Sequence, residues 1–279
     1  MDHTVLLPGG FVEEDGTINR EAVITEMTGK TQTILGRRDL QKKPLEMINK
    51  VVADCLESFA GRDNIGASMR EDMLAGDRDY LLIEIRKASL GNMVTQEFQC
   101  GNENCGVTLY EEVDLEKLTV WDLPEVSDKT NISVETIDTP KGSKLTRLWT
   151  TRTESGDMIA VGRHVSCKDM TESMNNKNPI LTVQNLSTRI LHSITINGEE
   201  HRGPFDANWL ADQPFRVVTF LQACVGEQAC GPQLLIKTEC PECDHKQEVQ
   251  LDISGFFISS TERRERGSML TKRSGSSAQ

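Results

Sequence analysis

The sequence lacks the features that would place a protein in a membrane, on a secretory route or along nucleic acid. No apolar run approaches the roughly 18 residues that a membrane-spanning helix needs, so we expect no membrane insertion. The first residues, MDHTVLL, carry neither a basic stretch nor a long apolar one, so we expect no secretory signal and reduced thiols. The net charge of −12 argues against broad contact with nucleic-acid phosphates.

Recognisable catalytic motifs are also missing. The sequence contains no GxSxG, no phosphate-binding loop, no Rossmann fingerprint and no HExxH, and its five histidines show no metal-ligand spacing. We therefore expect a protein that is not an enzyme. The 279 residues, of which 37% are hydrophobic, are enough for two ordinary domains with modest cores.

What the chain does contain is an internal repeat. Residues 44–90 and 179–225 each begin with an amphipathic segment opened by proline, then have a polar loop, a Leu-Ala pair and a second amphipathic segment. Each half continues into an extended segment that ends in a cysteine pair, followed by another extended segment with acidic residues. This shared order predicts an α+β fold of two tandem repeats. In each repeat, helices would pack beside a small antiparallel sheet that ends in a Cys-pair, zinc-knuckle-like hairpin.

Local patterns predict the helices of both repeats. Apolar residues at three- and four-residue spacing predict one helix that starts near residue 44 and another that starts near residue 179. Asn178 before Pro179 is typical of a helix start, and Asp77 and Asp212 are expected to cap the helices that follow. The apolar stripes are Leu45, Ile48, Val52, Cys55 and Phe59, and Ile180, Val183, Leu186, Ile190 and Ile194.

The remaining segments predict hairpins, a connection and a tail. Asp15-Gly16 between extended runs indicates a hairpin, and residues 145–163 resemble a two-stranded entry to the second repeat. The last residues are Ser-rich and basic without apolar periodicity, which is typical of segments that are disordered or that fold only on a partner. We expect a first repeat with an N-terminal hairpin at 1–118, a linker at 119–144, a second repeat at 145–258 and a disordered basic tail at 259–279.

The eight cysteines carry the most specific chemical signal. Cys240-Pro-Glu-Cys243 has the form of a zinc knuckle, and Cys100-Gly-Asn-Glu-Asn-Cys105 is a lengthened version of it. Each pair supplies two sulfurs, whereas structural zinc takes four ligands. The duplication therefore predicts that both pairs share one structural zinc ion.

Other interpretations of these cysteines remain open. The pairs could form disulfides or stay free thiols, and His245 could replace one ligand. A redox role for Cys240 and Cys243 is disfavoured, because the flanking pattern is strand–turn–strand and not the helix N-terminus that lowers a thiol pKa. Cys224 and Cys230 are expected to be packed or loop thiols.

The motifs together resemble a known family. LPGGFVEEDGTINREAVITEMTG, LAGDRDYLLIEIRKASLG and the cysteine hairpin that ends in VDL are similar to the T4-type phage baseplate protein family. TECPECDHKQEVQLDI matches the CPxCG knuckle and acidic-hydrophobic strand of its members, with Asp244 in place of the glycine. CGNENCGVTLYEEVDL matches the same pattern with a longer knuckle. The resemblance covers roughly residues 7–118 and 145–257.

The resemblance implies a non-enzymatic structural or assembly component of the baseplate of a contractile phage tail or contractile injection system. Its implied partners are other baseplate, hub or wedge proteins in a symmetric oligomeric assembly, with no nucleic acid. It would be cytoplasmic during assembly and then part of the virion or injection-particle baseplate. The alternative is a zinc-ribbon adaptor or regulatory protein unrelated to phage tails, and a third hypothesis is a thiol-redox enzyme.

Overall fold

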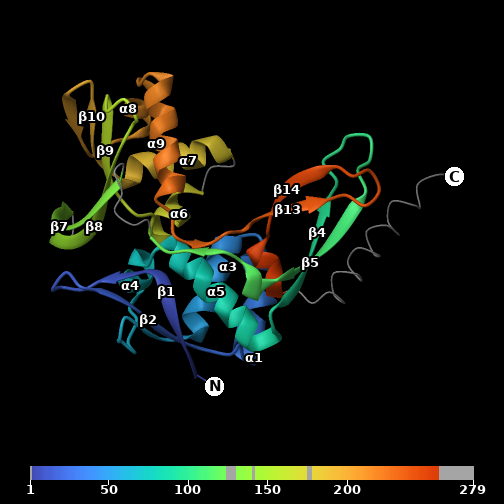
Figure 1. The fold of residues 1–279 in the computed structure, drawn as a ribbon. Coiled ribbons are helices and arrows are strands. Elements are labelled where there is room, and N and C mark those ends of the chain that lie inside the picture. The colour runs from blue at the N-terminus through green and yellow to red at the C-terminus, as the bar shows by residue number, and fades with distance from the viewer. Residues whose placement is uncertain (1, 124–129, 140–141, 175–177, 258–279) are drawn as a thin grey trace. The chain divides into compact units, whose positions relative to one another are not determined.

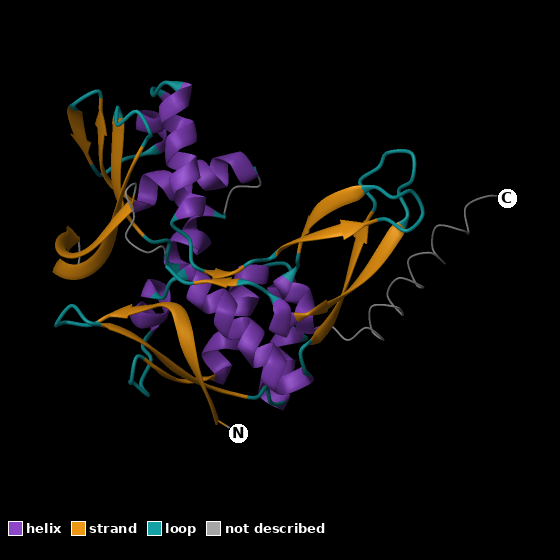
Figure 2. Ribbon diagram, in the orientation of Figure 1, coloured by secondary structure: helices purple, strands orange, loops and turns teal. Residues whose placement is uncertain are grey.

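A computed structural model describes residues 2–123, 130–139, 142–174 and 178–257, and the predicted basic tail lies outside these residues. The fold is α+β, with helices and several small antiparallel sheets (Figures 1 and 2). The chain divides into two compact units. Unit 1 consists of Met1–Thr25, Cys55–Leu81 and Val120–Pro232, and unit 2 of Glu26–Asp54, Leu82–Thr119 and Gln233–Gln279.

The first sheet of unit 1 is antiparallel, with strand order β1-β2-β3. Its turn is the predicted hairpin: Gly16 has a φ of +85°, and the Glu13 N–H donates to the Thr17 carbonyl at 2.8 Å. The register shifts between Leu6 and Phe11, so β1 bends where the sequence has two glycines. The elements are β1 (Asp2–Val12), β2 (Ile18–Thr25), β3 (Leu56–Phe59) and α4 (Ala67–Asp72).

The second sheet of unit 1 has the order β11-β10-β9-β8-β7 and packs against helices. Its core surrounds Trp149, whose ring lies so close to Gly162 that any Cβ there would overlap it. The two strands predicted within residues 145–163 are confirmed as the antiparallel pair β8 and β9. The elements are β7 (Thr130–Thr139), β8 (Gly142–Arg152), β9 (Met158–Arg163), α6 (Cys167–Ser173), α7 (Pro179–Ile190), β10 (Leu191–Ile196), β11 (Glu199–Arg202), α8 (Ala207–Ala211) and α9 (Phe215–Glu227).

Unit 2 contains helices and two hairpins, and the two hairpins are separate two-stranded sheets. Its apolar core lies at the base of the hairpins and includes Ile83, Val94, Val113, Leu251 and Phe256. The elements that contribute are α1 (Gly29–Leu35), α2 (Arg38–Gln41), α3 (Pro44–Cys55), the later part of α5 (Ala75–Leu90), β4 (Met93–Gln99), β5 (Thr108–Asp114), η1 (Leu115–Lys117), β13 (Leu235–Glu239), β14 (Lys246–Gln250) and η2 (Ile253–Phe257).

The amphipathic helices α3 and α7 both end before the last residue of the apolar stripe that predicted them. α3 ends at Cys55 and α7 at Ile190, and each passes directly into a strand. Phe59 and Ile194, the last residues of the two stripes, are buried from β3 and β10. Four-residue spacing alone cannot detect this change, because a buried strand residue can continue a helical stripe by coincidence.

The prediction that Asp77 and Asp212 cap the starts of helices is wrong. α5 begins at Ala75, so Asp77 lies inside the helix, where its carboxylate binds backbone N–H groups from a distant strand. Asp212 ends α8, and Pro214 precedes α9. The Asn178 cap is confirmed, because its side chain accepts a hydrogen bond from the Ile180 N–H.

The segment 119–144 contains regular structure as well as a connection. β6 (Val120–Trp121) pairs with β12 (Gly231–Pro232), and β7 pairs with β8 over ten residue positions. The prolines of this segment do not interrupt the pairing, because Pro124 and Pro140 lie outside the described strands. Within the described residues, no helix has both the length and the apolar character to cross a membrane.

Candidate metal centre

The first cysteine pair lies at the tip of the β4–β5 hairpin. The Cys100 N–H donates to the Val107 carbonyl at 2.9 Å, and the Cys105 N–H donates to the Asn102 carbonyl at 2.9 Å. The Asn102 side chain also accepts from the Asn104 N–H at 3.0 Å. Gly106 follows with a φ of +57°, which lets the chain turn back into β5. The lengthened loop therefore forms a tight turn that is closed at both cysteines.

The second pair lies at the tip of the β13–β14 hairpin. The Cys240 N–H donates to the His245 carbonyl at 2.9 Å, and the Asp244 N–H donates to the Cys240 carbonyl at 2.8 Å. Asp244 has a φ of +54° and thus takes the left-handed conformation that Gly106 takes in the first hairpin. Aspartate tolerates this conformation better than most residues, so the missing glycine does not prevent the knuckle from forming.

The two hairpin tips bring all four predicted ligands together. The Cys100 and Cys243 sulfurs are 3.6 Å apart, and the Cys105 and Cys240 sulfurs are 3.9 Å apart. All four sulfurs lie within 4.8 Å of one another. Four thiolates around a zinc ion at about 2.3 Å would be about 3.8 Å apart, so the donor set and its spacing fit a tetrahedral metal ion.

Side chains around the sulfurs position the hairpins against each other. Gln247 of β14 accepts a hydrogen bond from the Gly101 N–H at 2.6 Å and donates to the Gln99 carbonyl at 3.3 Å. The Asn102 amide lies 3.7 Å from the Cys243 sulfur. Phe98 and Leu109 provide an apolar surround. Such contacts hold the ligands in place before a metal arrives.

The four thiols influence one another's protonation. The backbone N–H of His245 lowers the pKa of Cys243, and neighbouring thiols lower it further by donating to its thiolate. The backbone at Asn102 favours the Cys100 thiolate, but burial and the other thiols oppose it and raise the pKa of Cys100 to about 12. Several thiolates this close together need a cation for compensation. The four clustered sulfurs are therefore suited to a metal ion.

The other four cysteines are not part of this cluster. No disulfide joins any of the eight cysteines, all of which lie in the described part of the chain. Cys55, Cys167 and Cys224 are buried, and the pKa of Cys224 is raised to about 12 by burial. His245 contributes its backbone and is not among the clustered side chains.

A buried polar cluster in unit 1 had no recognisable sequence signal. Asp77 on α5 accepts hydrogen bonds from the Gly9 and Gly10 N–H groups at 2.7 and 2.8 Å. Arg147 on β8 donates to the Gly9 carbonyl at 2.9 Å. Burial raises the pKa of Asp77 to about 6, against the effect of these hydrogen bonds and of Arg147. These hydrogen bonds fix the bend of β1. Arg147 and Gly9 are 138 positions apart in the chain, so no local sequence pattern could predict that they interact.

Fold and centre together define an α+β protein with a four-cysteine cluster that can hold a metal ion. Residues 18–258 match the family model described as T4 bacteriophage base plate protein, so the chain belongs to this family. Neither the comparison with curated proteins nor the comparison with solved structures gave a match.

Proposed function

We propose that the protein is a non-enzymatic structural or assembly component of the baseplate of a contractile phage tail or contractile injection system. The observation that carries the proposal is the family match over residues 18–258, which covers most of the chain. The same match favours this role over a zinc-ribbon adaptor unrelated to phage tails. The protein would reach the virion or injection-particle baseplate after assembly in the cytoplasm.

Its partners would be other baseplate, hub or wedge proteins in a symmetric assembly, and not nucleic acid or membrane. The net charge of −12 supports protein partners over phosphate backbones. The test is co-purification from the native operon with a tag on this chain. Recovery of sheath-, hub- or wedge-type proteins in fixed ratio supports the proposal. Retention on duplex DNA at about 150 mM salt, without such proteins, would contradict it.

Cys100, Cys105, Cys240 and Cys243 are proposed to bind one structural zinc ion. Four sulfurs with no carboxylate or imidazole suit zinc better than the oxygen-seeking cations. When bound, zinc would supply charge compensation and a crosslink between the hairpin tips. Metal analysis of the purified protein should find about one zinc per chain, and replacement of one cysteine should abolish binding and not halve it.

The two repeats are proposed as products of a duplication, with the boundaries 1–118 and 145–258 and the linker 119–144. The shared elements support this, in the order hairpin, short capped helix, longer helix that passes into a strand, two further helices and knuckle hairpin, whereas α2 and β11 each occur in one half alone. The short helices α1 and α6 both begin with a capping box, at Thr28 and Ser166. β3 pairs with β2 as β10 pairs with β9.

An experimental structure would test the duplication directly. Residues 30–116 superposed on residues 165–254 should align these elements in order, related by a pseudo-twofold axis. Both knuckles lie in unit 2, so the proposed zinc joins two hairpins within one compact unit. A different path of the chain in either half would contradict the duplication.

A further inference from the structure

The two faces of the β4–β5 hairpin have different surroundings. Val94, Leu109 and Val113 on its inner face are buried. The alternate residues form the outer face, where Met93 is 49% exposed and Tyr110 is 62% exposed. No described segment covers this outer face. One large apolar side chain on each of the two strands is therefore exposed to water.

The outer face is also acidic: Asp114 pairs with Lys117 at 3.6 Å, but the other two outer carboxylates have no basic partner among the described residues. Residues 93–114 contain five acidic side chains and no lysine or arginine. Glu97 lies directly opposite Tyr110, and Glu112 lies opposite Thr95. Neither glutamate forms an ion pair with any described residue, and both are exposed. An exposed tyrosine ring beside unpaired carboxylates favours a ligand with guanidinium groups.

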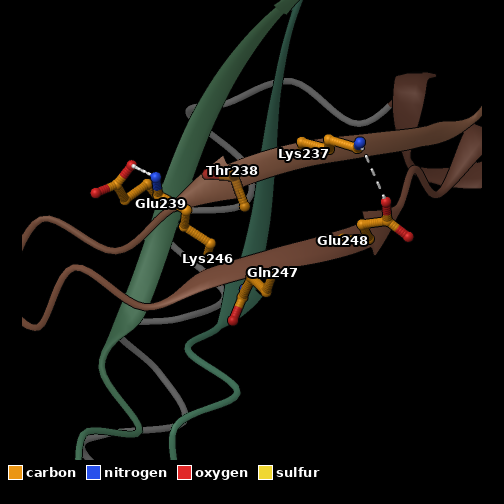
Figure 3. A pocket seen from close by; sticks show the side chains of 6 residues that line it. All are labelled: Lys237, Thr238, Glu239, Lys246, Gln247 and Glu248. Carbon is orange, nitrogen blue, oxygen red and sulfur yellow. Dashed lines mark ion pairs between the residues drawn. The ribbon is translucent and has the colours of Figure 1, made fainter.

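The β13–β14 hairpin of the same unit does not share this property. A hollow on it is lined by Lys237, Thr238, Glu239, Lys246, Gln247 and Glu248 (Figure 3). Its charges are paired across the strands, from Lys237 to Glu248 and from Lys246 to Glu239, each at 3.7 Å. Along the strands of the two hairpins, the carboxylates without a basic partner are therefore concentrated on β4–β5.

A basic segment of the chain follows the core that packs against the inner face of this hairpin. Phe256 is buried in the core that also contains Val94 and Val113, at the base of the β4–β5 hairpin. The Arg86 Nε donates to its carbonyl at 2.7 Å, which anchors the backbone there. Residues 258–279 follow, with five basic and two acidic side chains. The first arginine, Arg263, is six residues beyond Phe257, so it can reach up to about 20 Å from the anchor. The hairpin has only two strands, which lie about 5 Å apart, so this reach is enough for the segment to pass around a strand edge from the inner-face side to the outer face.

We propose that the outer face of β4–β5, formed by Met93, Glu97, Tyr110 and Glu112, binds the basic segment 258–279 of the same chain. The arginines pair with the two glutamates and stack on Tyr110, and Met269 and Leu270 offer apolar side chains for Met93. Attachment at Phe257 keeps the segment close to its surface, which favours this occupant over a free basic protein. The proposal concerns a surface separate from the four sulfurs and does not depend on the baseplate role.

Trypsin digestion of the full-length protein tests the proposal, because trypsin cleaves after the arginines of the segment. At about 50 mM salt, E97Q/E112Q should be cleaved between residues 258 and 279 at least about threefold faster than the unaltered protein. At about 1 M salt, where exposed charges are screened, the two rates should become equal. The variant E239Q/E248Q removes the same charge from β13–β14 and should behave like the unaltered protein. Equal melting temperatures of all three proteins exclude a folding defect.

A photo-crosslinking residue at position 110 identifies the occupant. Crosslinks from Tyr110→benzoylphenylalanine to residues 258–279 within one chain are expected, and mixed isotope labelling separates them from crosslinks between copies. Crosslinks only to a second copy, or only to another protein, would overturn the assignment. Equal cleavage of E97Q/E112Q and the unaltered protein at low salt would overturn it as well.

Discussion

The apolar core of unit 1 and the hairpin pair of unit 2 are stabilised in different ways. The unit 1 core buries Trp149, Ile194, Leu221 and their neighbours between a five-stranded sheet and helices. The hairpin pair buries apolar side chains at its base and sulfurs at its tip. Between them lie polar contacts such as Thr238 to Glu111. A two-stranded hairpin is marginally stable in water, so the tips need a crosslink that the unit 1 core does not need.

Removal of the proposed zinc should have the largest effect and should distinguish the two regions most clearly. Chelation, or the substitution Cys105→Ser, is expected to reduce bound metal from about one ion per chain to nearly none. The hairpin tips should then lose hydrogen-exchange protection, because each would be an isolated two-stranded ribbon. The core around Trp149 should keep its protection, and Cys224→Ala should retain the metal. Equal loss of protection in both regions would mean that the distinction is wrong.

Leu221→Ala should have the next largest effect, on unit 1. Leu221 is 1% exposed on α9, and its truncation leaves a cavity in the core. We expect a loss of about 2–5 kcal/mol in the free energy of unfolding, without any change in metal content. Phe215→Ala on the same helix is the matched control, since Phe215 is 80% exposed. Its effect should stay within about 0.5 kcal/mol, as measured by denaturant unfolding.

Asp77 should make the stability of unit 1 depend on pH. Its pKa is about 6 in the folded protein, above the ordinary value of 3.8. The folded state therefore binds the proton more tightly, so the favourable contribution is complete below about pH 4 and is lost as pH rises through about 6. The free energy of unfolding of the unaltered protein, minus that of Asp77→Asn, should fall by on the order of 3 kcal/mol over this range. A difference that rises with pH would contradict the burial of this carboxylate.

The two left-handed turn residues should give the smallest effects, with opposite signs. Asp244→Gly should stabilise the second hairpin by about 0.5 kcal/mol, because glycine adopts a positive φ without strain. Gly106→Ala should destabilise the first hairpin by about 1 kcal/mol, since a Cβ there meets no atom within 4 Å and only the backbone is strained. Thermal unfolding of the metal-loaded protein measures both. Two changes of the same sign would show that the knuckles are not equivalent.

Local patterns in the sequence were sufficient for the parts of the fold that depend on neighbouring residues. The Asp15-Gly16 hairpin, the Asn178 cap and the strands beside the knuckles all occur where turn chemistry, capping and alternation predict them. The ligand type was also readable, because two cysteines in a tight turn present sulfurs at the spacing of a metal site. These features need only a few consecutive residues.

The tertiary structure decided what depends on residues far apart in the chain. It brought together cysteines 135 and 143 positions apart, and it ended both long helices early so that Phe59 and Ile194 could enter sheets. It also turned Asp77 from an expected cap into a buried acceptor for Gly9 and Gly10. Burial and long-range hydrogen bonding depend on which segments meet, and periodicity within one segment carries no information about its distant partner.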